Sequence, residues 1–277
     1  MGLPENFLSG NAPSHLQEAQ VRSWVLHEDE DFLVFNKPGG VVCHPSKDGP
    51  WSSLVGACRE VYELPRVHLA HRLDRETSGL VVLARHRASA RRIQMAFTAG
   101  QVRKGYLAIV EGSFAEERQA KGSLAKALDS EVYIKQAVRE SRSAQKAHTD
   151  FFPLWSGETV SLIVCIPRTG RKHQIRAHSS WLGYPICGDK IYGPDDQWYL
   201  RFIENGWTEE MKAHLRLPRQ ALHAGILAFT DAEGQAVNFT APLPADMEAL
   251  LREEGCGESV TGLVARAEDI FREHCPR

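Results

Sequence analysis

The sequence has 277 residues, of which 43% are hydrophobic and 25% are charged, an ordinary composition for a globular protein. This excludes a disordered chain and a small disulfide-stapled scaffold. No apolar run approaches the roughly 20 residues that span a bilayer, and residues 1–20 hold no basic cluster followed by an apolar stretch. We therefore expect no membrane segment and no secretory signal.

The cysteine pattern and the charge pattern reduce the number of function classes that fit the sequence. Six cysteines lie far apart without a CxxC pair, which argues against a zinc site and favours reduced thiols in a cytoplasmic protein. The net charge is −2, but residues 66–106 hold nine Lys or Arg against two acids, and residues 245–277 hold eight acids against four Arg. This segregation fits either a basic surface for phosphates or ordinary solvated helix faces.

The first half of the chain predicts short strands with two helices between them. Residues 1–20 lack periodicity and predict an arm or loop. Residues 24–27 and 32–35 predict strands, residues 52–62 a helix, and the continuous apolar run 79–84 a strand buried on both faces. Residues 87–98 predict an Ala-rich helix that ends before Gly100.

The second half continues the α+β pattern. Strands are predicted at 106–110, 147–154 and 159–166, with a hairpin or excursion at 113–145. A helix is predicted at 170–181, a Gly/Pro/Asp-rich loop at 183–196, and a late hairpin at 223–230 and 236–240 around 231–234. Helices at 245–254 and 260–274 close the chain. The stretch 195–220 predicts either a substrate-specific insertion or a structural helix.

Reactive residue types first gather in the segment HRLDRETSG, residues 71–79, directly before the buried strand. A loop at the end of a strand can hold a carboxylate rigidly. Asp74 lies between Arg72 and Arg75, whose charges favour its ionised form, so it suits a nucleophile or a base. An Asp that caps a turn within a surface charge network is the plainer alternative.

A second basic segment, RTGRKHQIRAH, covers residues 168–178 and predicts a helix that starts at its Thr-Gly pair. Cations in a first helical turn oppose the helix dipole unless an anion lies against them. Helical spacing places His173 and Arg176 on one face, so Arg176 can point inward beside a buried carboxylate. His173 and His178 are five residues apart, which does not suit a helical zinc pair.

A tyrosine stands between these segments, in KGY at residues 104–106. Tyr106 is either a core aromatic or a residue that stacks on a base and moves a proton. The sequence contains no Walker A loop, no GxGxxG and no GxSxG elbow, which excludes the corresponding nucleotide-binding and hydrolase motifs.

These three segments, at 71–79, 104–106 and 169–178, resemble the ordered motifs of RluA-type RNA pseudouridine synthases. Supporting pieces occur in the family's order, namely NKPG at 36–39 with HP at 44–45, PICGDKIYG at 185–193 and LHA at 222–224. The resemblance runs from residue 24 to residue 242.

The resemblance implies an α+β fold with a mixed, mostly antiparallel bent sheet, flanking helices and a central active-site cleft, and no metal or cofactor. We expect an N-terminal arm at 1–22, the pseudouridine synthase catalytic domain at 23–244, and a C-terminal helical extension at 245–277 that packs on the same domain. The expected partner is RNA, either tRNA or ribosomal RNA, bound by a monomer in the cytoplasm.

The resemblance also assigns roles to individual residues. Asp74 would initiate cleavage of the bond between uracil and ribose, Tyr106 would stack on the target base and help remove its carbon 5 proton, and Arg176 would pair with Asp74. Arg72 would fill the gap left when the uridine is flipped out of its stack. The residues expected to contact RNA are His71, Arg72, Arg75, Thr77, Lys104, Arg171, His173 and Gln174. Whether Asp74 attacks the sugar or the base stays open.

Three features separate this sequence from many relatives and from rival functions. The residues before the first strand leave no room for a small N-terminal RNA-binding domain, which favours RNA recognised by the catalytic domain itself. An RNA-binding factor that does not isomerise its target would have no physical need for Asp74, Tyr106 and Arg176 together. A two-carboxylate hydrolase would need a second acid, and only Glu76 is near, in a basic loop.

Overall fold

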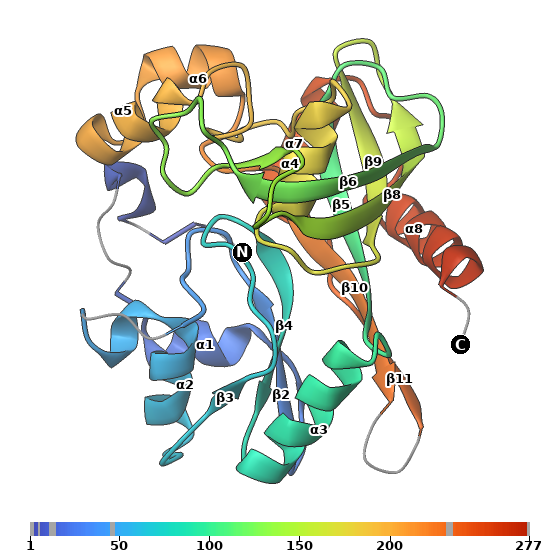
Figure 1. The fold of residues 1–277 in the computed structure, drawn as a ribbon. Helices are drawn as coiled ribbons and strands as arrows, with labels where there is room; N and C mark the ends of the chain where they lie inside the picture. The colour runs from blue at the N-terminus through green and yellow to red at the C-terminus, as the bar shows by residue number, and fades with distance from the viewer. Residues whose placement is uncertain (1–2, 5, 11–14, 45–47, 231–234, 276–277) are drawn as a thin grey trace. The chain divides into compact units, whose positions relative to one another are not determined.

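The protein is described by a computed structural model that covers residues 3–4, 6–10, 15–44, 48–230 and 235–275 (Figure 1). The chain forms two compact units. Unit 1 consists of Met1–Lys104 and Ala224–Ala241, and unit 2 consists of Gly105–His223 and Pro242–Arg277. Residues 1–22, the predicted arm, fall in unit 1, and residues 245–277, the predicted extension, fall in unit 2. The boundaries of the catalytic domain stay predictions.

Unit 1 is built on a sheet with the strand order β1-β2-β4-β10, with β3 also on β4 and β11 on β10. The strands are β1 (Val25–Glu28), β2 (Phe32–Lys37), β3 (His68–Leu69), β4 (Ser78–Ala84), β10 (Leu222–Thr230, in unit 1 from Ala224) and β11 (Ala236–Thr240). The pairs β1–β2, β2–β4, β3–β4 and β10–β11 are antiparallel. Lys37 pairs with Gly79, so the end of β2 lies beside the start of β4.

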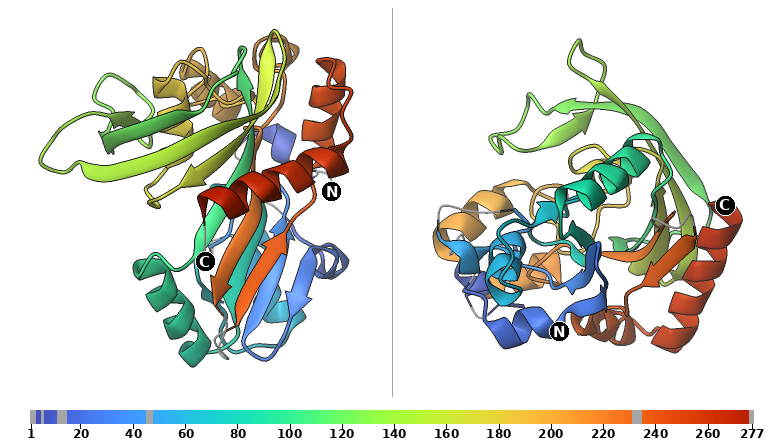
Figure 2. Two further views of the ribbon diagram at one scale, coloured as in Figure 1. Left: turned by 90° about the vertical axis from the view of Figure 1, so that its right-hand side faces the viewer. Right: turned by 90° about the horizontal axis from the view of Figure 1, so that it is seen from below.

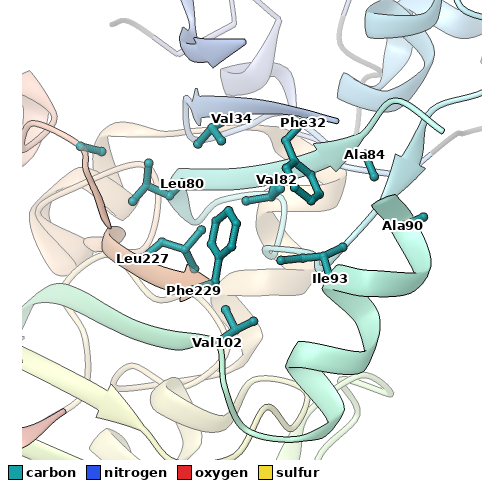
Figure 3. Packing of buried hydrophobic residues seen from close by; sticks show 11 residues of the cluster. Phe32, Val34, Leu80, Val82, Ala84, Ala90, Ile93, Val102, Leu227 and Phe229 are labelled. Carbon is teal, nitrogen blue, oxygen red and sulfur yellow. The ribbon is translucent and has the colours of Figure 1, made fainter. Parts of the chain in front are cut away.

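The core of unit 1 lies between its sheet and helix α3 (Arg87–Thr98) (Figure 3). Every residue of β4 is buried, as its uninterrupted apolar sequence predicts. On α3, Ala90 and Ile93 are three residues apart and pack toward the strands, whereas Arg91 and Arg92 are exposed. The other helices of unit 1 are η1 (Phe7–Ser9), α1 (Glu18–Ser23), η2 (Pro50–Ser52) and α2 (Leu54–Val61).

The strands of unit 2 follow the order β5-β9-β8-β6-β7, and each neighbouring pair in this order is antiparallel. The strands are β5 (Arg103–Glu111, in unit 2 from Gly105), β6 (Arg118–Lys126), β7 (Gln136–Val138), β8 (Gln145–Ser156) and β9 (Val160–Pro167). The helices are α4 (Gln174–Trp181), α5 (Gln197–Asn205), α6 (Glu209–Leu215), α7 (Ala245–Glu253) and α8 (Val260–His274). Helix α8, red in Figure 2, packs on β8 and β9. Helix α4 contacts β6 and β7.

The predicted α+β class with mostly antiparallel strands and flanking helices is confirmed. The central cleft stays a prediction. The hairpin expected within 113–145 is present as β6 and β7, and the stretch 195–220 contains helices α5 and α6. The expected turn at 231–234 and Pro45 lie outside the described residues. None of the described helices is long and apolar enough to cross a membrane.

Two predictions of local structure were wrong. The arm contains helix α1, which is held by a capping box in which the side chains of Gln17 and Gln20 bind each other's backbone. The helix expected from residue 170 begins only at Gln174, because His173 has a left-handed φ of 55° and interrupts helical geometry. Arg171 and Lys172 therefore precede α4, and they are not the opposing charges of its first turn.

Candidate functional site

In unit 1, Asp74 lies in the loop between β3 and β4, which we call the Asp74 loop (residues 70–77). The Thr77 N–H donates to the Asp74 carbonyl over 3.2 Å and closes a turn around the carboxylate-bearing residue. Asp74 is half-buried and Thr77 is buried, whereas Arg72 is exposed. The loop therefore combines a partly shielded carboxylate with a solvent-facing cation.

A buried lysine, Lys37, holds the backbone of the Asp74 loop. The Lys37 side chain is fully buried, and its Nζ donates to the carbonyls of Pro38, Val41 and Arg75 at 2.9, 3.0 and 3.2 Å. A buried ammonium is tolerated only when such acceptors replace its water. Lys37 thus joins the turn that follows β2 to the Asp74 loop.

Arg75 makes a second connection between the same two segments. The Gly40 N–H donates to the Arg75 carbonyl at 2.8 Å, and the Arg75 Nε donates back to the Gly40 carbonyl at 3.2 Å. The Arg75 guanidinium carbon also lies 5.5 Å from the centroid of the Phe7 ring, which is fully buried. Gly40 has a φ of +85°, and a Cβ there would lie 2.9 Å from Phe7 Cδ2. The N-terminal segment therefore packs on the turn that supports Asp74.

His71 and Lys104 both lie against the ring of Phe97 in unit 1. The Val82 N–H donates to His71 Nε2 at 3.2 Å, and the His71 ring lies 5.1 Å from Phe97. Lys104 Nζ lies 5.7 Å from the centroid of the same ring. Burial, with a smaller effect of Lys104, lowers the pKa of His71 to about 3, and burial also lowers the pKa of Lys104. His71 is therefore neutral at physiological pH and acts as an acceptor that holds the loop to β4.

The strand that follows the Asp74 loop, β4, has a glycine at its second residue, Gly79, where only glycine fits. Gly79 has a φ of +111°, and a Cβ on it would lie 2.3 Å from the Ala224 carbonyl oxygen of β10. Both the backbone conformation and the close approach of β10 exclude a side chain. The glycine at the end of the 71–79 motif therefore has a structural reason.

In unit 2, Arg176 is held in one orientation by a buried carboxylate. Its Nε lies 2.6 Å from Asp189 Oδ2 and its Nη2 2.8 Å from Asp189 Oδ1, a two-point ion pair. Asp189 is completely buried and also accepts the N–H groups of Ile191 and Tyr192. Burial acts to raise the pKa of Asp189, but the Arg176 charge and these hydrogen bonds outweigh it and lower the pKa. Asp189 is therefore an anion that fixes the direction of Arg176.

Tyr192 completes the support of Arg176. The Arg176 guanidinium carbon lies 5.0 Å from the Tyr192 ring centroid. The Tyr192 hydroxyl accepts the Gln136 N–H at 2.8 Å and lies 3.0 Å from His173 Nδ1. One ring therefore joins strand β7, the residue before α4 and the guanidinium.

Gln174 holds the backbone that precedes α4. Its Oε1 accepts from the Thr169 hydroxyl at 2.6 Å and from the Arg171 N–H at 3.0 Å. Its Nε2 donates to the His148 carbonyl and to Thr149 Oγ1, both at 2.9 Å. Because Gln174 is buried with these four contacts, it shapes the loop that presents the exposed Arg171.

The structure distributes the predicted site residues between the two units. Unit 1 holds His71, Arg72, Asp74, Arg75, Thr77 and Lys104, and unit 2 holds Tyr106, Arg171, His173, Gln174 and Arg176. Tyr106 is half-buried on β5, opposite Cys165 of β9. The predicted pairing of Asp74 with Arg176 joins residues of different units and stays a prediction, as do the catalytic and RNA-binding assignments.

Three supporting residues had no role in the sequence analysis. Lys37 and Asp189 lie in the NKPG and PICGDKIYG segments, and Tyr192 follows Asp189 by three residues. The available signal was a charged residue inside a short motif that otherwise carries turn-forming or apolar residues. No group of three or more His, Cys, Asp or Glu side chains in the described part of the chain is arranged to hold a metal ion.

Comparisons with known proteins agree with the motifs. Residues 31–181 match the family described as RNA pseudouridylate synthase. The chain is 34% identical over 236 residues to an uncharacterized RNA pseudouridine synthase of Bacillus subtilis, covering 83% of this chain and 76% of that protein. It is 33% identical over 257 residues to the ribosomal large subunit pseudouridine synthase D of Xanthomonas campestris, covering 90% and 72%.

A solved structure shows the same similarity in three dimensions. Human RNA pseudouridylate synthase domain containing 4 superimposes with a TM-score of 0.65 at 27% identity, covering 85% of this chain and 95% of that one. The matched segment 31–181 includes Asp74, Tyr106 and Arg176. The chain therefore belongs to the RNA pseudouridylate synthase family, the isomerases that convert uridine to pseudouridine in RNA.

Proposed function

We propose that the protein isomerises specific uridines of structured RNA, ribosomal RNA or tRNA, and that Asp74, Tyr106 and Arg176 are its catalytic residues. The observation that carries this proposal is the family match, which spans all three residues in their motifs. The supports of the Asp74 loop and of Arg176 are consistent with it, because a catalytic group must be held in a fixed geometry by its neighbours.

The reaction breaks the bond between N1 of uracil and C1′ of ribose, and joins C5 to C1′ after the base rotates. The C5 hydrogen leaves as a proton, and N1 gains one, so the overall change is an isomerisation. We assign the start of cleavage to Asp74, and stacking on the base and help with removal of the C5 proton to Tyr106. Arg176 keeps the carboxylate of Asp74 ionised by pairing with it.

We also propose that the RNA is held by residues of both units. Arg72 fills the space of the flipped uridine, and the exposed Arg171 contacts the phosphate backbone. Arg75, Thr77 and Lys104 lie near the RNA backbone. The buried contacts of His71, His173 and Gln174 favour a part in shaping the RNA-binding loops. Monomeric state and cytoplasmic location stay predictions from the sequence.

Ribosomal RNA is the first substrate to test. Two relatives, from Xanthomonas campestris and Nitrosomonas europaea, are named ribosomal large subunit pseudouridine synthase D, at 33% and 32% identity. The test measures tritium release from ribosomal RNA and from tRNA labelled at carbon 5 of uracil. We expect release by the wild type from one of these RNA classes.

The decisive variant is Asp74→Asn, which keeps the size of the side chain and removes its charge. We expect loss of tritium release with retained RNA binding. Glu76→Gln serves as the matched control, because Glu76 is an acid two positions away in the same loop. This variant should retain tritium release. Undiminished release by Asp74→Asn would exclude the proposed chemistry, and release lost in both variants would indicate a damaged loop.

A further inference from the structure

Two large apolar side chains stand out on the connection between β6 and β7, which we call the 127–135 loop. Leu128 is 74% exposed and Tyr133 is 77% exposed. Among the described residues, no other large hydrophobic side chain is as exposed; Met95 follows at 61%. Two large apolar side chains exposed on one short loop make this loop a candidate contact surface.

The exposure of Tyr133 does not come from a loosely attached loop. Val132, the residue before it, is buried in a cluster with Leu124 and Tyr192. The Lys135 N–H donates to the Val132 carbonyl at 2.9 Å, and Lys135 Nζ lies 3.0 Å from an oxygen of Asp196 near α5. Figure 1 shows this green segment beside α5. The loop is anchored on both sides of Tyr133, and the ring points outward from a fixed base.

A lysine holds the Tyr133 ring from one side. Lys126 Nζ, at the end of β6, lies 3.7 Å from the ring centroid. The side chain of Arg139, which follows β7, donates from Nη1 to the Lys126 carbonyl at 3.4 Å and places a second cation beside the backbone of Lys126. The result is an exposed aromatic ring with one cation on its face and a second cation at the neighbouring backbone.

The charge of the surrounding segment favours a polyanion as the partner. Residues 118–146 contain seven Lys or Arg against three Asp or Glu. Aromatic rings stack on nucleobases and cations contact phosphates, and this combination is typical of proteins that bind unpaired nucleic acid. An apolar protein partner would account for Leu128 but not for the excess of positive charge.

The 127–135 loop is also joined to residues already expected to bind RNA. Gln136, the first residue of β7, directly follows the loop. Its N–H donates to the Tyr192 hydroxyl, which in turn contacts His173. On the neighbouring strand pair, Arg171 Nε donates to the Lys146 carbonyl at 3.2 Å. A nucleotide on Tyr133 would therefore lie within the same unit as Arg171 and His173.

We propose that Tyr133 is a stacking platform for an unpaired nucleobase of the substrate RNA, outside the target uridine, and that Lys126 and Arg139 contact the adjacent phosphates. The inference rests on the proposed function, because it takes the RNA substrate as the partner. It names a feature of that substrate: a single-stranded nucleotide next to the structured element that contains the target.

The test compares two labelled stem-loop RNAs that differ in one single-stranded extension, which carries adenines in the first and abasic sites in the second. Binding is measured by fluorescence anisotropy with the full chain. We expect Tyr133→Ala to bind the adenine RNA about tenfold more weakly than the wild type, and to bind the abasic RNA as the wild type does. Tyr133→Trp should retain the preference for adenine, and Lys126→Ala should reduce the salt dependence of binding.

Trp181→Ala is the matched control, because Trp181 is a 55% exposed aromatic of unit 2 outside this surface. Its affinity for both RNAs should equal that of the wild type. Equal losses on the adenine and abasic RNAs with Tyr133→Ala, or no loss on either, would overturn the proposal and leave a protein as the partner of the loop.

Tritium release by the wild type, measured beside these titrations, separates the two hypotheses. Release with no effect of Tyr133→Ala on binding would reject the stacking platform alone. Absence of release, together with an adenine-dependent effect of Tyr133→Ala, would reject the proposed reaction and retain the RNA contact.

Discussion

The Asp74 loop of unit 1 and the Arg176 region of unit 2 are held by different kinds of interaction. In unit 1, Lys37 and Gly40 bind backbone atoms, so the path of the loop is fixed independently of most of its side chains. In unit 2, Arg176 is held by the Asp189 carboxylate and the Tyr192 ring. A substitution of Asp189 or Tyr192 therefore alters Arg176 directly, whereas the loop around Asp74 is held by several hydrogen bonds, among them those of Lys37 and Gly40.

Of the variants that test this difference between the two units, Asp189→Asn is expected to lose the most stability and activity. The change leaves the Arg176 charge buried beside a neutral amide, and loss of one partner of a buried ion pair costs about 3 kcal/mol or more of unfolding free energy. Displacement of Arg176 should also reduce tritium release about a hundredfold. Chemical denaturation and the release assay check these two values.

Glu210→Gln is the control for Asp189→Asn, because it breaks the exposed pair of Glu210 with Arg201. Exposed pairs contribute about 1 kcal/mol or less, so this variant should remain close to the wild type in stability. If both variants lost the same stability, the buried pair would have no special role.

Asp189 also predicts a dependence of stability on pH. Its pKa is lower in the folded protein than the ordinary value of 3.8, so the pair contributes stability above pH 3.8 and loses it as the pH falls toward the folded pKa. In denaturation between pH 5 and pH 3, Asp189→Asn should show a smaller decline than the wild type. A steeper decline in the variant would contradict the buried anion.

A smaller effect is expected from Lys37→Met. The methionine fills similar space but removes the lysine donor from the carbonyls of Pro38 and Val41, while the Arg75 carbonyl keeps the Gly40 N–H. We expect a loss of about 2 kcal/mol of unfolding free energy. Tritium release should fall as well, because the Asp74 loop loses its support. The exposed Lys172→Met variant is the control for loss of a lysine charge, and equal stability of the two variants would argue against the role of Lys37.

The smallest effect at neutral pH is expected at His71. Its folded pKa of about 3 lies below the ordinary value of 6.5, so the unfolded chain binds more protons between these values and stability falls as the pH is lowered through this range. His71→Gln keeps an acceptor for the Val82 N–H and should flatten that decline. Two-dimensional NMR of the wild type should show no titration of His71 above pH 5, and a midpoint near pH 6.5 would disprove its neutral state.

Much of the fold could be predicted because local patterns were strong. The apolar run of β4 and the three-residue spacing of Ala90 and Ile93 on α3 indicate their burial directly. The start of α4 could not be predicted, because the left-handed backbone of His173 interrupts a segment whose residue types otherwise suit a helix. Helix α1 was missed because its capping box uses Gln17 and Gln20, which do not mark a helix start as clearly as Ser or Asp.

The candidate site shows a similar limit. The motifs pointed to Asp74, Tyr106 and Arg176, but the partners that hold them are distant in sequence. Arg75 is 38 residues from Lys37, and Arg176 is 13 residues from Asp189. Such pairs follow from tertiary packing, which no local periodicity encodes.

The three carbonyls around Lys37 resemble the oxygen shell of a bound cation, with the difference that this cation is tethered to the chain. Its amine is completely buried, so an acylating reagent can reach it only when the surrounding turn opens. The rate at which Lys37 is labelled, measured by mass spectrometry, would therefore report the opening of the Asp74 loop. RNA that stabilises the closed loop should slow the labelling of Lys37. The labelling rate of an exposed lysine such as Lys172 serves as the internal standard for the reactivity of the reagent.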